Sequence, residues 1–247
     1  MSDDMPQKIT THATRAFRDT ADKDYITARM CLKNRLPQQF LWSTQQAFEK
    51  YLKAILLYNR IPNTKPSHDL MYLYTKVQGI DGLDFSIPEV SENFIFHINN
   101  QEPNRYFDKP YFLTIDADEL LDQTVWSIRR FCYQMKPYVS KRTTTLEDEK
   151  EKALALKPRE TQIKNGFLEK VLENRQDPRR KYLTWHNQYY GQSHLKTDFA
   201  GFQFGNPGYF TDQPKGADDL ALFEQLNKLI FFPKDLRDHM QEKTQSQ

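Results

Sequence analysis

Three polar side chains recur at every fourth position of a segment that is otherwise rich in apolar residues: Gln45, Glu49 and Lys53. In a helix they share one face, so a polar stripe runs along a helix whose other faces favour burial. The stripe is either a solvated face with an intrahelical Glu49–Lys53 pair or a surface that contacts a polar ligand. His68 follows after a short loop. Its imidazole could fix that loop by hydrogen bonding, or it could polarise a phosphate or transfer a proton.

A second group of reactive residue types begins with His97 and continues with Arg105 and Tyr106 after a proline at position 103. Arg105 could hold a phosphate through two hydrogen bonds, and Tyr106 could stack on a base. Alternatively, Arg105 caps the carbonyls at a helix end and Tyr106 packs beneath it. Arg105, His97 and His68 are therefore the candidates for a catalytic role, and each also has a structural interpretation.

A basic cluster lies beside aromatic rings in the last third of the chain. Its members are Arg175, Arg179, Arg180, Lys181, Tyr182, Trp185, Tyr189 and Tyr190. This combination is typical of surfaces that bind single-stranded nucleic acid, although a helix end with rings packed into a core has the same composition. No pattern of metal ligands or phosphate-binding glycines is present, so neither a metal nor a cofactor is expected.

Composition favours a helical protein with a sizeable core. The 247 residues are 38% hydrophobic and include only 8 glycines, and 35 basic side chains nearly balance 33 acidic ones. Cys31 and Cys132 lie on apolar helix faces without metal-ligand spacing, so we interpret both as reduced core residues. The start of the chain lacks the features of a signal peptide, and no apolar run is long enough for a membrane span. A cytoplasmic protein without a membrane partner is expected.

Apolar spacing predicts an all-α fold, an antiparallel up-and-down bundle of about five helices in residues 1–139. The expected helices contain Ala21 to Leu32; Pro37 to about Tyr58; Leu70 to Val77, capped by Ser67; Val90 to Ile98, opened by a Ser86–Glu89 capping box; and Leu121 to Val139, opened by Asp116 and Glu119.

A change of composition near residue 140 predicts a domain boundary. Residues 140–247 form an appended, partly irregular extension, with charged helices at 146–156 and 159–173 and a last helix at about 217–230. Between them, residues 182–210 are rich in aromatic side chains and favour loops or short strands. We expect these rings to pack against the bundle or a second subunit, and the bundle to fold alone.

Three separated motifs together resemble the HEPN domain family. They are Gln-Gln-Ala-Phe-Glu-Lys-Tyr-Leu-Lys-Ala at 45–54, Ser-His-Asp-Leu at 67–70 and Asn-Arg-Tyr-Phe-Asp at 104–108. Their order and spacing agree with the family pattern, and the resemblance covers about residues 12–139. It implies a nucleotide- or RNA-binding site made by Gln45, Glu49, Lys53, His68, Arg105, Tyr106 and Asp108.

Ribonucleases of this family carry an Arg-x4-6-His motif near the fourth helix. No histidine follows Arg105 at that distance, and His97 precedes it instead. The match is therefore to the branch without the nuclease motif. One literal match, from Arg180 to His186, lies outside the resembling region, and such a pair arises easily by chance.

The resemblance implies a component of a prokaryotic defence or toxin-antitoxin type system that binds nucleotide or single-stranded RNA. It also implies a homodimer, with a nucleotidyltransferase-type protein as a candidate partner. Two alternatives stay open. One is a divergent, metal-independent endoribonuclease that acts as a dimer, and the other is a non-enzymatic protein-interaction module.

Overall fold

The computed structural model describes residues 5–64, 68–101, 111–113, 116–132, 163, 166–190 and 210–212. The first helical rod is unbroken from Met5 to Lys33 and consists of α1 (Met5–His12), a π-helical segment η1 (Ala13–Arg18) and α2 (Asp19–Lys33). A turn with Arg35 at a positive φ of 58° then reverses the chain. Next comes α3 (Pro37–Tyr58), which starts with its proline in the first turn as the sequence predicts.

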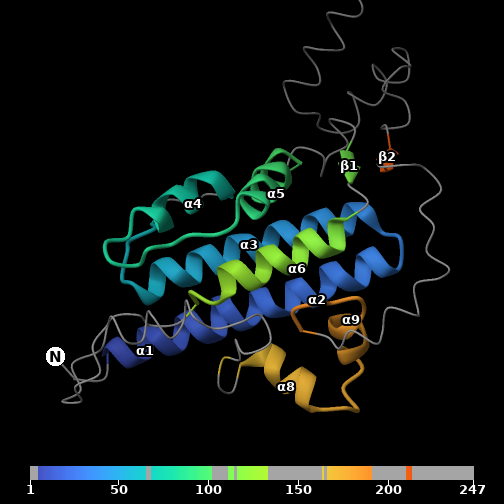
Figure 1. The fold of residues 1–247 in the computed structure, drawn as a ribbon. Helices are drawn as coiled ribbons and strands as arrows, with labels where there is room; N and C mark the ends of the chain where they lie inside the picture. The colour runs from blue at the N-terminus through green and yellow to red at the C-terminus, as the bar shows by residue number, and fades with distance from the viewer. Residues whose placement is uncertain are drawn as a thin grey trace, which may run out of the picture.

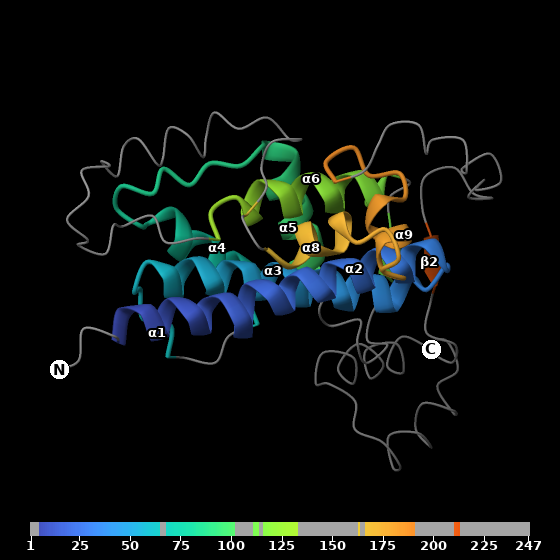
Figure 2. The same cartoon turned by 90° about the horizontal axis from the view of Figure 1, so that it is seen from below.

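The remaining helices pack around the pair formed by α2 and α3. They are α4 (Leu70–Gln78), α5 (Glu89–Asn100), α6 (Ala117–Arg129), α8 (Phe167–Glu173) and α9 (Arg180–Thr184). Figure 1 shows α4 and α5 on one side of the central helices and α8 and α9 on the other, and Figure 2 shows α8 and α9 against α2. The five helices predicted for the first part of the chain are present, so the all-α bundle is confirmed.

Two short strands are the exception to the helical fold in the described residues. β1 (Tyr111–Leu113) and β2 (Phe210–Asp212) pair antiparallel, with Phe112 opposite Thr211. The pairing brings a segment near the end of the chain back to the connection between α5 and α6.

Several helix ends differ from the sequence predictions. The cap of α4 is Asp69, whose carboxylate accepts hydrogen bonds from Met71 N and Tyr72 N. Neither predicted capping box forms, because α5 begins after Pro88 and the Asp116 side chain makes no capping bond. The last predicted bundle helix ends at Arg129 instead of continuing to 139, and residues 133–139 lie outside the described part. Val90, the first apolar residue of the predicted fourth helix, is exposed.

One hydrophobic core joins the bundle to the region after residue 140. Leu168 and Val171 of α8 and Leu183 of α9 belong to the same cluster of buried residues as α2, α3 and α6. The ring of Tyr190 also lies 5.9 Å from that of Tyr25 on α2. The described rings of the aromatic stretch thus pack against the bundle, as the sequence predicts. The proposed boundary near 140 and the predicted helices at 146–156 and 217–230 lie outside the described residues.

Both cysteines are buried and free, in agreement with their predicted place in the core. Within the described ranges, none of the helices combines the length and the apolar character needed to cross a bilayer.

Candidate functional site

The candidate site is built around Glu49, a buried carboxylate near the middle of α3. One turn later on the same helix, Lys53 places its Nζ 2.5 Å from Glu49 Oε1. His68 precedes α4 and places its Nδ1 3.0 Å from Glu49 Oε2. The carboxylate therefore engages one partner with each oxygen, and it holds a lysine and an imidazole on the same side of the bundle.

The surroundings of Glu49 keep it ionised. Burial would raise the pKa of its carboxyl, but hydrogen bonds and charge interactions with Lys53 and His68 outweigh that effect and lower the pKa below its usual value. Because Glu49 is an anion, it can orient both partners. The His68 side chain is 59% exposed, so solvent or a ligand can reach the imidazole while Nδ1 stays fixed.

The start of α4 is tied to the end of α5. The backbone N–H of Leu70 donates to Asn99 Oδ1 at a distance of 2.7 Å. Asp69 caps the same helix end. The start of α4, directly after His68, is therefore held both by the Asp69 cap and by Asn99. Asn99 therefore belongs to the framework of the site. Its spacing gave no signal, because the contact joins residues 29 positions apart.

The structure brings together Glu49, Lys53 and His68, and it places Gln45 one turn earlier on α3. Gln45 and Glu49 are 2% and 6% exposed, so the solvated-face interpretation is wrong for these two residues. The Glu49–Lys53 pair that this interpretation included is confirmed. His97 lies on α5 with its ring stacked 6.3 Å from Phe94.

Arg105, Tyr106 and Asp108 lie outside the described residues. Their segment begins just after Gln101, the C-terminal cap of α5. The chain enters it from the end of the helix that carries Asn99 and His97.

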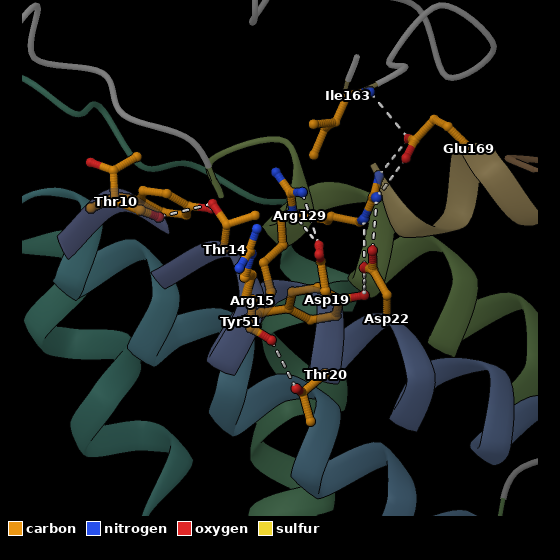
Figure 3. A network of polar contacts seen from close by, with 12 residues as sticks. Thr10, Thr14, Arg15, Asp19, Thr20, Asp22, Tyr51, Arg129, Ile163 and Glu169 are labelled. Carbon is orange, nitrogen blue, oxygen red and sulfur yellow. Dashed lines mark hydrogen bonds and ion pairs between the residues drawn. The ribbon is translucent and has the colours of Figure 1, made fainter. Parts of the chain in front are cut away.

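A network of buried charges, which spacing did not reveal, attaches α8 to the bundle (Figure 3). Arg129 on α6 donates two hydrogen bonds to the Asp22 carboxylate, at 2.7 and 2.9 Å, and two to the Glu169 carboxylate, at 2.7 and 2.8 Å. Tyr51 donates to Asp22 as well, and Ile163 N donates to Glu169. All the carboxylate oxygens around this arginine are therefore engaged.

A second buried pair attaches α9. Arg29 on α2 contacts the Asp122 carboxylate and donates to the main-chain oxygens of Tyr182 and Trp185. Tyr25 donates to the same Asp122 oxygen, at 2.6 Å. Burial raises the pKa of Asp122 to about 7, although Arg29 and Tyr25 oppose this shift. Both networks are structural, because they lie in the core.

Among the residues that the structure describes, no group of three or more histidine, cysteine or acidic side chains is placed to hold a metal ion. The groups that the structure describes around Glu49 are an ammonium group and an imidazole.

Comparison with known families identifies the part of the chain that carries this site. The model of the HEPN domain matches residues 14–131, the stretch from η1 to the end of α6. This part of the chain is therefore a HEPN domain, in agreement with the three sequence motifs. No curated protein and no solved structure shows significant similarity to the chain.

Proposed function

We propose that this HEPN-domain protein binds nucleotide or single-stranded RNA on the surface around Lys53 and His68, as a component of a prokaryotic defence or toxin-antitoxin type system. The observation that carries the proposal is the Glu49 carboxylate with Lys53 and His68 on its two oxygens. Two potential cations are held side by side there, and a phosphate group needs such donors. The setting within such a system rests on the family alone.

The buried carboxylate serves to position the other two groups. A lysine on an exposed helix face loses much side-chain entropy when it binds a ligand, whereas Lys53 is already held at 2.5 Å from Glu49. The segment with Arg105, Tyr106 and Asp108 is proposed to add a phosphate contact and a stacking ring. A homodimer would enclose this surface, and a nucleotidyltransferase-type protein is the proposed partner.

One observation favours ribonuclease activity as a second candidate function. His68 is exposed, and its Nδ1 faces an ionised carboxylate, which is how proteins orient an imidazole for proton transfer. His68 would then act as the acid or base, with Lys53 near the phosphate. His97 is a less favourable candidate because its ring stacks on Phe94 inside α5.

A binding and cleavage assay tests both functions in one experiment. Labelled single-stranded RNA is mixed with the full chain at low salt, with and without EDTA, and retention and cleavage are both measured. Lys53→Ala and His68→Ala are compared with two matched controls. Lys50→Ala removes a lysine of α3 that is also 2.5 Å from a carboxylate, and His12→Ala removes an exposed histidine of α1.

The proposal is supported if the parent chain binds RNA, Lys53→Ala binds it about tenfold or more weakly, and Lys50→Ala binds it as the parent does. Cleavage in EDTA that disappears in His68→Ala but not in His12→Ala supports the ribonuclease function. Equal binding by all variants contradicts the proposed site. No retention of RNA or of nucleotide by the parent chain contradicts the proposed function.

A further inference from the structure

A basic pocket of about 430 Å³ is lined by residues of α9, by the residues that precede it and by Lys33 at the end of α2. α9 lies on the side of the bundle away from α4 and α5 (Figure 1). Its lining includes four cationic side chains and one carboxylate: Lys33, Arg175, Arg180, Lys181 and Asp177. Trp185 forms part of the wall. The pocket lies beyond residues 14–131, apart from Lys33, so the HEPN domain does not account for it.

The single carboxylate of the lining is already neutralised. Asp177 accepts hydrogen bonds from Arg179 at 2.8 Å and 2.6 Å. These bonds lower the pKa of Asp177 to about 2, so it stays ionised and paired with Arg179 at neutral pH. Within the described ranges, Lys33, Arg175, Arg180 and Lys181 form no ion pair. Among the residues that the structure describes, the lining of the pocket therefore carries a net positive charge.

Three of the four cations make contacts that orient them. Arg180 donates its Nε to the carbonyl oxygen of Leu172, at 2.9 Å, which orients the guanidinium and leaves its two terminal nitrogens available. Lys33 places its Nζ 5.1 Å from the centre of the Trp185 ring, within the range of a cation–π contact. Arg175 and Lys181 are exposed, and Lys181 places its Nζ 4.8 Å from the centre of the Tyr182 ring. The arrangement is a concave surface in which Arg180, Lys33 and Lys181 each have a contact that orients the side chain.

The shape of the pocket selects among anionic ligands. A single strand of RNA needs an extended basic surface with exposed rings on which successive bases stack. Here Trp185 is only 6% exposed and is covered by Lys33, so it offers little ring area. A compact group with several negative charges fits a concave site lined by four cations, because arginine binds phosphate oxygens bidentately and lysine adds a point charge.

We propose that this pocket binds the polyphosphate group of a nucleoside triphosphate and contributes little to recognition of the base. The site is separate from the surface around Glu49, because α8 and α9 lie across the bundle from α4 and α5 (Figure 1). The inference does not depend on RNA binding at that surface.

Calorimetric titration of the full chain with ATP, at low salt, tests the proposal. The pocket variant is Arg175→Gln with Lys181→Gln, since both side chains are exposed and the structure gives neither a hydrogen bond. The control, Arg15→Gln with Lys170→Gln, also removes one arginine and one lysine from exposed helix positions, but outside the pocket. Thermal melts confirm that both variants are folded.

We expect the pocket variant to bind ATP about a hundredfold more weakly and the control to bind within about twofold of the parent chain. Inorganic tripolyphosphate should compete with ATP, while adenosine should not.

Three results would overturn the proposal: no binding of ATP by the parent chain, equal weakening in the control, or competition by an RNA with a 5′-hydroxyl end that is as strong as competition by tripolyphosphate. The last result would assign the pocket to the phosphodiesters of a strand.

Discussion

Replacing Arg129 by methionine should severely destabilise the protein. The guanidinium is buried and donates four hydrogen bonds, two to Asp22 and two to Glu169. Its removal leaves two carboxylates in the core without their cation. Asp22 keeps only the hydroxyl of Tyr51, and Glu169 keeps the N–H of Ile163. The variant therefore has two uncompensated buried charges.

The magnitude follows from the burial of the cluster. Removing one partner of a buried ion pair costs about 3–5 kcal/mol of the free energy of unfolding, because the remaining charge is unpaired in a medium of low dielectric constant. For a chain of this size, each 1 kcal/mol lowers Tm by about 2–4 °C. Arg129→Met should therefore lower Tm by about 6–20 °C. Arg130→Met is the control, because the structure bonds that arginine to the main-chain oxygens of Ser127 and Ser86.

A rescue experiment separates the charge effect from loss of packing. Adding Asp22→Asn and Glu169→Gln to Arg129→Met removes both uncompensated charges and keeps an acceptor for Tyr51. The triple variant should regain at least about 1 kcal/mol over Arg129→Met, measured by chemical denaturation. Limited proteolysis should also cut α8 (Phe167–Glu173) faster in Arg129→Met than in the parent chain. A single variant as stable as Arg130→Met, or a triple variant that regains nothing, would refute this reasoning.

Four further outcomes are expected. Burial raises the pKa of Asp122 to about 7, so the native state keeps a proton that the unfolded state releases above about pH 4. The free energy of unfolding should therefore fall as the pH rises from about 4 to about 7. Denaturation at pH 5 and pH 8 should show a smaller fall for Asp122→Asn. Asp69→Ala removes the cap of α4 and should lower Tm by about 2–4 °C in a thermal melt. Light scattering should give a homodimer of twice 29.4 kDa, and a monomer at micromolar concentration would contradict it. Calorimetry should give residues 1–139 a lower Tm than 1–190, since only the longer fragment supplies the Tyr182 oxygen that accepts from Arg29 and the Glu169 carboxylate that accepts from Arg129; equal Tm values would contradict this.

Local patterns predicted much of the bundle and part of the site. Apolar spacing and a proline identified α3 from Pro37 to Tyr58, since its buried face repeats with the helical period over many turns. The four-residue spacing of the polar stripe predicted the contact between Glu49 and Lys53, because side chains at i and i+4 lie next to each other on any helix. Interactions within one helix can be predicted from sequence because the backbone alone fixes their geometry.

Apolar spacing did not predict where α6 ends. Residues after Arg129 continue the pattern, and Cys132 is fully buried, yet α6 ends at Arg129. Periodicity indicates which side chains face the core, whereas a helix end depends on the hydrogen bonds of the backbone. The expected capping boxes failed for a similar reason. Among the predicted cap regions that the structure describes, only the one before α4 has a capping side chain: Asp69 accepts hydrogen bonds from backbone N–H groups of the first turn.

Long-range polar contacts left no signal in the sequence. Arg129 meets Asp22 across 107 positions, and His68 meets Glu49 across 19 positions and a loop. An arginine on a helix is usually exposed, so nothing in the sequence indicated that Arg29 and Arg129 are buried. Their partners depend on the packing of the helices, which local patterns do not determine.

These buried arginines connect the HEPN domain with the region that follows it. Arg29 and Arg129 lie within residues 14–131, but Tyr182, Trp185 and Glu169, which accept their hydrogen bonds, lie beyond it. Leaving these donors unpaired in the core would cost more than the loss of a surface contact. The contacts of α8 and α9 are therefore expected to stabilise the bundle core. Among the described residues, the core includes side chains from both sides of position 140. The basic pocket on α9 owes its position to Arg29, because the same guanidinium that pairs with Asp122 also holds the main chain at Tyr182 and Trp185.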